Sequence, residues 1–285
     1  WQAARANVAD VLKDESRGGS SFRLGRISRA LVVTEIALSA GLLVGAGLMI
    51  KSVTRLRTID FPFATEDVLT ARTGLPEAQY PDAESQRRFY EELMPRLRQL
   101  PNIHGIGLMQ ALPASSAGDS RFAVEGVTYP EDRDYPISNT MLAGPGAFDA
   151  VGVAVRQGRA FTEQDGVGSL PVAIVNEEFV RRFLEGQDPI GRRIRLGTRE
   201  SQEDWRTIVG VVPDMYVGGL DDDDDAPQAI YTPIAQGSAR FMSVAARVRG
   251  GDPMLLAEGV RDAVLAVDPD LPVYFIETLE KAIND

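Results

Sequence analysis

The sequence predicts an α+β fold in which one transmembrane helix precedes a larger domain, and three observations lead to this class. Residues 30–50 form an apolar stretch that contains a single charged side chain. Two strand–helix–strand patterns of nearly equal length follow, one after residue 66 and one after residue 240. Between them, glycine and proline divide residues 114–238 into short apolar runs, which is typical of β-strands joined by turns.

Composition limits the classes of function that the protein can have. The 285 residues include 30 Lys and Arg but 41 Asp and Glu, so the net charge is -11. Phosphate contacts need basic surface, so no nucleic-acid partner is expected. The absence of cysteine excludes disulfides, thiol nucleophiles and cysteine-ligated metals, and a single histidine, His104, excludes histidine-rich metal sites. Because the chain starts at Trp1 instead of methionine, we expect a segment of a longer protein.

Residues 30–50 are predicted to cross a membrane as a helix. At about 1.5 Å per residue, this stretch would span roughly 31 Å, which is close to the thickness of the hydrocarbon core of a bilayer. Basic residues lie at both ends, Arg26 and Arg29 before the stretch and Lys51 and Arg55 after it. A signal peptide would have a shorter apolar core followed by a small-residue cleavage site. A buried soluble helix would rarely be apolar on every side.

Small residues at Ala37, Gly41 and Gly45 are spaced by four and form one stripe of this helix. Such a stripe lets the backbone of another helix approach closely, so we expect helix packing there, although glycine is common in membrane helices generally. Glu35, the intramembrane charge, lies about one and a half turns inside the N-terminal boundary. Its carboxylate is expected to reach the nearby interface, because burying it fully would cost several kcal/mol. Contact with a helix partner or a proton path is the alternative.

The charges beside the helix predict its orientation. Residues 1–29 carry a net charge of +3, residues 30–57 of +2 and the remainder of -16. Five basic residues closely precede the helix and three follow it, so its N-terminal side is expected in the cytoplasm. The acidic body, from about Thr58 onward, would then be extracytoplasmic. Residues 1–29 would form a cytoplasmic segment with an amphipathic helix over 1–13 and a flexible linker over 15–21.

The first strand–helix–strand pattern begins soon after the membrane helix. It comprises a strand at 67–73, a helix at 83–99 and a strand at 103–109. Asp82 is the expected N-cap of the helix, because its carboxylate can accept hydrogen bonds from the first free backbone N–H groups.

The second pattern repeats this order near the C-terminus. It comprises a strand at 241–248, a helix that begins at Asp252-Pro253 and a strand at 273–276. The similar lengths suggest an internal duplication, although chance is an alternative because such units are common. Packed together, the two units would form a ferredoxin-like subdomain from residues 58–113 and 239–280.

The chain between the two units, residues 114–238, is expected to form an inserted β-rich subdomain. One short helix is predicted at 177–184. The candidate strands are the apolar runs at 122–127, 151–155, 172–175, 193–196 and 207–212.

No arrangement of residues predicts catalysis. Walker A, Rossmann, HExxH and GxSxG motifs are absent. His104 has no oriented partner, and Ser115, Ser116 and Ser120 occupy a polar loop, so no catalytic, cofactor-binding or metal-ligating residue is predicted. The five acids at 221–225 could attract a cation, but EF-hand spacing is missing and a solvated loop is the expected interpretation.

Several segments together resemble the permease subunits of MacB-type ABC transporters, particularly large permeases with two repeated halves. The stretch 29–55 resembles the helix that starts a repeat, and residues 61–71 resemble the passage into the extracytoplasmic domain of that family. Each match is weak alone, and their shared order carries the resemblance. The further matches are GRAFT (158–162), VAIVNE (172–177), PIG (189–191), IVGVV (208–212) and GDP (251–253).

The resemblance implies a periplasmic core domain. Its porter part would consist of the two strand–helix–strand units, and its inserted sabre part would be residues 114–238. The resemblance also implies that a separate cytoplasmic ATP-binding subunit hydrolyses ATP and that this chain holds no cofactor. The chain would be a noncatalytic permease segment of an export or mechanotransmission complex in the bacterial inner membrane. The implied partners are the lipid bilayer, other membrane helices of the permease, and extracytoplasmic proteins or an exported substrate.

The chain departs from the family in its membrane part. Such permeases have several membrane helices per half, whereas one is predicted here, so the chain would be one helix and one core domain of a larger permease. The alternative function is an extracytoplasmic ligand-sensing domain of a membrane receptor, which would also join an anchoring helix to such a body. A membrane-anchored hydrolase is a third class, which the missing catalytic constellation disfavours.

Overall fold

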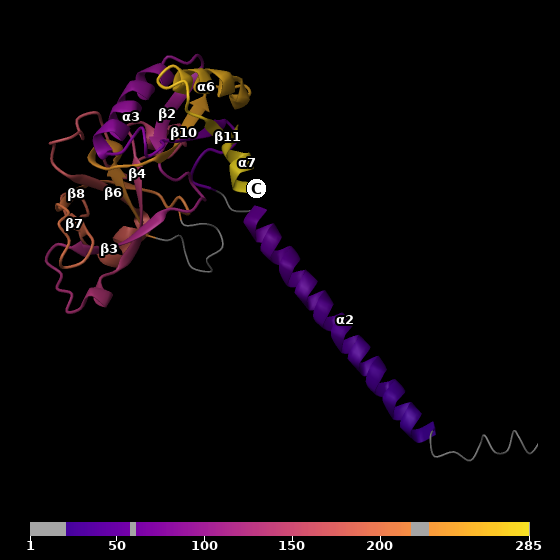
Figure 1. Ribbon diagram of the computed structural model, residues 1–285. Coiled ribbons are helices and arrows are strands. Elements are labelled where there is room, and N and C mark those ends of the chain that lie inside the picture. The colour runs from indigo at the N-terminus through magenta and orange to yellow at the C-terminus, as the bar shows by residue number, and fades with distance from the viewer. Residues whose placement is uncertain (1–20, 58–60, 218–227, 285) are drawn as a thin grey trace, which may run out of the picture. The chain divides into compact units, whose positions relative to one another are not determined.

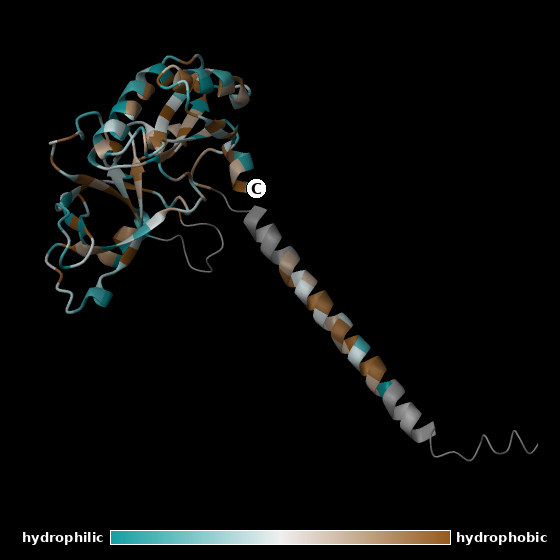
Figure 2. Ribbon diagram, in the orientation of Figure 1, coloured by the Kyte–Doolittle hydropathy of each residue, from teal (hydrophilic) through white to brown (hydrophobic). Residues whose placement is uncertain are grey.

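The computed structural model describes residues 21–57, 61–217 and 228–284, and the chain divides into two compact units, Trp1–Asp60 and Phe61–Asp285 (Figure 1). Within the described part of the first unit, the chain forms one helix, α2 (Ser21–Arg57). Its portion Arg29–Met49 is long and apolar enough to cross a membrane, and no other helix among the described residues is. Figure 2 shows apolar residues along this portion.

Helix α2 is longer than the predicted stretch 30–50. It continues to Arg57 because residues 51–57 contain neither proline nor glycine, so nothing interrupts the backbone hydrogen bonds. It also begins at Ser21, which corrects the last residue of the expected linker from coil to helix. The expected helix over 1–13 and the rest of the linker lie outside the described residues.

The two strand–helix–strand units of the second unit interlock in one antiparallel sheet. The strand order is β11-β1-β10-β2, so β10 lies between β1 and β2 and is antiparallel to both. This order is ferredoxin-like, as the repeated pattern predicted. The elements are β1 (Val68–Gly74), α3 (Ala83–Leu97) and β2 (Ile103–Met109), then β10 (Phe241–Val248), α6 (Ala257–Leu265) and β11 (Val273–Thr278).

Both helices pack on one face of this sheet, and their starts follow the predicted caps. Leu69 and Ala71 of β1 lie in a core cluster with α3 and α6. The Asp82 carboxylate accepts a hydrogen bond from Ser85 N at 2.8 Å in a capping box. A short 3₁₀ turn, η3 (Pro253–Leu256), precedes α6, and the Asp252 carboxylate accepts from Met254 N at 2.9 Å.

The chain between β2 and β10 forms the rest of the sheet. Six strands run in the order β4-β3-β7-β8-β6-β9, and β9 pairs back onto β4, so this part closes into a ring. The two-residue strand β5 (Gln157–Gly158) pairs with β8, and α4 (Ala147–Ala150) and α5 (Glu177–Phe183) interrupt the strands. The six strands are β3 (Gly118–Val124), β4 (Ile137–Ala143), β6 (Val172–Asn176), β7 (Arg193–Leu196), β8 (Arg206–Val212) and β9 (Ala229–Pro233).

The expected strand at 151–155 is wrong. This run follows α4 as a turn, in which Val153 N donates to the carbonyl of Phe148 at 2.8 Å. Val151 and Val153 are buried in a core cluster, so this apolar run packs into the core without forming a strand. Strands β4 and β9 were not predicted, and the expected boundaries of the inserted subdomain, at 114 and 238, stay predictions.

Candidate functional site

The small-residue stripe of α2 lies on an exposed helix surface. Ala37, Gly41, Gly45 and Glu35 are all exposed, and apart from the adjoining residues and the helix's own backbone, no described atom lies within 4 Å of a Cβ placed at either glycine. The Thr34 hydroxyl donates to the carbonyl of Ala30 at 2.9 Å, so this polar group is satisfied within the helix. The stripe is accessible to another helix, and its role in helix packing stays a prediction, as does the role of Glu35.

The first and last described segments of the second unit lie against each other. Phe61 stacks on Phe63 with ring centroids 4.8 Å apart and meets Tyr216 edge-on at 6.0 Å. The backbone N–H of Glu280, in α7 (Leu279–Asn284), donates to the carbonyl of Thr65 at 3.2 Å. Ile283 of α7 packs on the same core cluster as Phe61, so the first and last described segments of the second unit are held by the same group of buried side chains.

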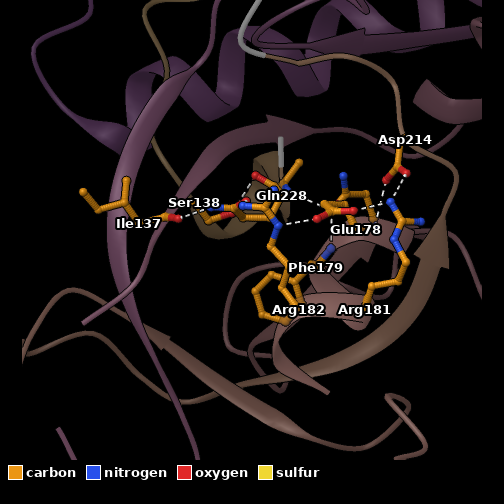
Figure 3. Close-up of polar contacts among 10 residues, drawn as sticks. Ile137, Ser138, Glu178, Phe179, Arg181, Arg182, Asp214 and Gln228 are labelled. Carbon is orange, nitrogen blue, oxygen red and sulfur yellow. Dashed lines mark hydrogen bonds and ion pairs between the residues drawn. The ribbon is translucent and has the colours of Figure 1, made fainter. Parts of the chain in front are cut away.

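A charged cluster surrounds the first turn of α5 (Figure 3). The Glu178 side chain is only 6% exposed and forms ion pairs with both Arg181 and Arg182, which lie three and four residues later on the same helix. Arg181 also reaches the Asp214 carboxylate at 3.2 Å, and the other oxygen of Asp214 accepts from Glu178 N at 2.9 Å. The pKa of the Arg181 guanidinium is raised, because its two acidic partners outweigh the effect of burial.

The same cluster joins strands that are distant in sequence. Arg182 donates to the Gln228 side-chain oxygen at 3.0 Å, and the Gln228 amide donates to the carbonyl of Ile137 at 2.6 Å. Asn176 Oδ1 accepts from both Phe179 N and Ala229 N. The cluster therefore fixes the described segments on both sides of residues 218–227. Its charged groups form ion pairs with one another. Such pairing is typical of a cluster that holds chain segments together, whereas a reactive centre needs a charged group that is left to contact a substrate.

A second buried charge explains the GRAFT segment. Asp165 is 5% exposed, and its carboxylate accepts two hydrogen bonds from the Arg159 guanidinium, at 2.7 and 2.8 Å. Thr162 N donates to the same carboxylate at 2.8 Å. Burial acts to raise the pKa of Asp165, but the hydrogen bonds from Arg159 and Thr162 outweigh it and hold the pKa below its ordinary value.

Replacing Asp165 with asparagine is expected to destabilise the protein by about 2 kcal/mol at pH 7. Because the folded-state pKa is lowered, the ionised carboxylate stabilises the fold above the unfolded pKa of about 4, and this stability is lost as the pH falls through the folded value. The difference between wild type and D165N should therefore shrink in acid, as measured by urea unfolding at pH 7 and below 4.

Glu163→Gln is the matched control for that prediction. Glu163 lies in the same loop and pairs with Arg98, but its side chain is exposed, so its loss should change stability by less than about 1 kcal/mol. A pH-independent difference for D165N would contradict the assigned role of the carboxylate.

The structure brings no catalytic set together among the candidate residues. His104 lies beside an open cleft with Asp149 and Arg249, and no serine lines that cleft. Ser115 and Ser116 border a different cleft, and Ser120 lies in β3. Within the described ranges, no group of three or more His, Asp or Glu side chains is placed to hold a metal ion. The acids at 221–225 lie outside the described residues.

Comparisons with known proteins found several similarities. The macrolide export ATP-binding/permease protein MacB of Aggregatibacter actinomycetemcomitans is 25% identical over 95 residues, which are 33% of this chain and 14% of that protein. The periplasmic region of MacB from Actinobacillus actinomycetemcomitans matches with a TM-score of 0.49 and 14% identity, over 76% of this chain and 91% of that structure.

The extracellular domain of the noncanonic ABC-type transporter YknZ from Gram-positive bacteria matches with a TM-score of 0.44 and 11% identity, over 70% of this chain and 93% of that structure. The sequence profile of the MacB-like periplasmic core domain matches residues 30–262, which is most of the chain. The matched region contains nearly all of the apolar portion of α2, the closed ring and the first strand–helix–strand unit, and it covers the second unit as far as residue 262 of α6. The chain therefore belongs to the family of MacB-like periplasmic core domains.

Proposed function

We propose that this chain is a noncatalytic permease segment of an ABC-type export or mechanotransmission complex. α2 anchors it in the bacterial inner membrane, and the second unit is extracytoplasmic. A separate cytoplasmic subunit binds and hydrolyses ATP, and other membrane helices of the permease carry the resulting motion to the second unit. The exported substrate or an extracytoplasmic protein is the recipient of that motion, and this chain needs no cofactor of its own.

One observation carries this proposal, namely that a helix able to cross a membrane precedes the second unit in a chain that belongs to the family of MacB-like periplasmic core domains. The contact between Thr65 and Glu280 gives the mechanical part a physical basis. A displacement of the chain at Phe61 is passed to α7 through this hydrogen bond and the shared core cluster, because packed interiors transmit strain. The ring and the four-stranded sheet meet at the same cluster, which draws residues from both.

The test is hydrogen exchange on the full protein purified from membranes in mild detergent. We expect an ATP-binding subunit to copurify. Exchange of the Glu280 amide, which Thr65 protects, should differ between the ADP-bound complex and a complex trapped with a nonhydrolysable ATP analogue. Copurification without any nucleotide-dependent exchange would contradict mechanotransmission. The absence of an ATP-binding subunit, together with exchange that responds to an extracytoplasmic ligand, would favour a receptor.

The small-residue stripe gives a second prediction. Gly41→Leu and Gly45→Leu should each reduce the recovery of the other membrane helices of the complex roughly tenfold, because a leucine side chain prevents close approach of two backbones. Gly47→Leu is the matched control. It lies about 200° around the helix from Gly45, and no described atom is near its Cβ position either. Normal assembly of both stripe variants in a quantitative pull-down would remove the stripe from the interface.

A further inference from the structure

A polar cleft of 340 Å³ opens on the face of the four-stranded sheet that α3 and α6 leave uncovered. Neighbouring residues of a strand point to opposite faces. Leu69 and Ala71 contact the helices, so Thr70 and Arg72 lie on the other face and line this cleft. Ser243 of β10 is the direct cross-strand partner of Arg72, which places their side chains together.

The cleft presents several hydrogen-bond donors. Arg72 takes part in none of the ion pairs among the described residues, and its guanidinium lies over the Phe241 ring at 5.6 Å. Ser243 is 4% exposed, and neither its hydroxyl nor that of Ser116 has a side-chain hydrogen bond within the described part of the chain. Gln110 accepts from Leu142 N through its side-chain oxygen at 3.1 Å, which leaves its amide N–H groups to donate.

The remaining polar groups of the cleft are already engaged. The Thr70 hydroxyl donates to the carbonyl of Glu277, and the Ser115 hydroxyl donates to the carbonyl of Leu112. The Glu277 carboxylate also borders the cleft, and one of its oxygens lies 3.1 Å from the Lys281 ammonium, which is outside the lining. Arg72 is therefore the charged group of the lining that has no ion-pair partner among the described residues, whereas Glu277 has one in Lys281.

Phe275 lies at the edge of this cleft and has a strained backbone conformation. Phe275 has φ +48, in the left-handed region that a bulky residue rarely adopts, and its side chain is 71% exposed. It lies where the pairing of β1 with β11 shifts register opposite Ala71. Burial of the ring does not compensate for the strained backbone, and strain of this kind is typical of binding surfaces.

We propose that this cleft binds an oxyanion, a phosphate or a carboxylate, carried on an apolar body that packs against Phe275. The Arg72 guanidinium and the donors of Ser116, Ser243 and Gln110 match the acceptor oxygens of such a group, and charge-assisted hydrogen bonds make the contact specific. The Phe275 ring supplies the apolar contact. This inference does not depend on the transport function, because it concerns a site within the second unit alone.

The experiment titrates phenyl phosphate into the full protein in phosphatidylcholine nanodiscs, with ligand-observed NMR as the readout. Arg72→Gln should weaken binding roughly tenfold or more, because it removes the charged donor. Arg88→Gln is the control, since Arg88 is an exposed arginine of α3 that pairs with Glu84. Phe275→Gly should also weaken binding of phenyl phosphate but not of inorganic phosphate, and it should raise the melting temperature, because glycine relieves the positive φ.

A second arm distinguishes the sources of the anion. Adding phosphatidylglycerol to the nanodiscs should compete with phenyl phosphate in wild type but not in R72Q if the natural ligand is a lipid headgroup, and it should not compete if the ligand is a free organic anion. Equal binding of phenyl phosphate by wild type and R72Q, or no binding at all, would overturn the proposal. Equal binding by wild type and F275G would overturn the part assigned to the aromatic ring.

Discussion

Replacing Phe179 with alanine is expected to lower the free energy of unfolding by about 3–5 kcal/mol, which is the largest effect we predict. Phe179 of α5 is completely buried, and its ring lies 5.0 Å from that of Phe122 and 5.1 Å from that of Phe183. Truncation removes these contacts and leaves a cavity that the closed ring of strands cannot collapse to fill. The loss would also loosen the charged cluster, because Glu178 is the preceding residue.

The measurement is chemical unfolding followed by circular dichroism. Phe275→Ala is the matched control, because it is the same chemical change at a ring that is 71% exposed, and we expect it to alter stability by less than about 0.5 kcal/mol. If F179A and F275A lost similar amounts of stability, the packing of α5 against the ring would not be a main source of the stability of this part.

Replacing Gly107 with alanine is expected to destabilise the protein by about 3 kcal/mol, because the added methyl group would overlap with neighbouring backbone atoms. A Cβ at Gly107 of β2 would lie 2.4 Å from Ala147 Cα and 2.5 Å from Ala147 N. Both are backbone atoms at the start of α4, so no side-chain rotation can relieve the overlap. α4 would have to move away from β2, and the core cluster to which Ala147 and Phe148 belong would be disturbed.

The change should appear as a fall in melting temperature of roughly 6–12 °C. Gly118→Ala is the control, because it lies in strand β3 and the nearest atom to its Cβ position is Thr140 O at an ordinary 3.8 Å. We expect G118A to be neutral or slightly stabilising, since glycine in a strand carries an entropic cost. Equal melting temperatures for G107A and G118A would show that α4 can shift freely.

The α5 cluster shows how far sequence reasoning reaches into the candidate site. Glu178, Arg181 and Arg182 have the i, i+3 and i+4 spacing that favours ion pairs on a helix, and the helix itself was predicted at 177–184. Their spacing could have identified the pairs. The burial of Glu178 and its link to Asp214 could not be predicted, because they depend on a chain segment 36 residues away.

The cleft beside Arg72 depends even more on tertiary structure. Its walls come from β1, β10, β11 and the loop after β2, which are up to about 200 residues apart in sequence. The sequence predicts that Ser115 and Ser116 lie in a polar loop, but nothing near them in the sequence indicates that Arg72 borders the same cleft. Phe275 lies in an ordinary apolar strand pattern, and its positive φ coincides with the register shift against β1, which joins distant parts of the chain.

Features that depend on neighbouring residues could be predicted from the sequence alone. The long apolar stretch specified a helix that can cross a membrane, and the periodic patterns with the caps at Asp82 and Asp252 specified both strand–helix–strand units. The pairing of the strands, in contrast, depends on tertiary contacts. Residues 229–233 form strand β9 because they pair in parallel with β4, for example Ala229 with Asn139, and all of them are buried. Residues 151–155 have no strand partner within the described part of the chain, and they form a turn instead. Backbone hydrogen bonds between strands join residues distant in the chain, so short-range pattern cannot specify them.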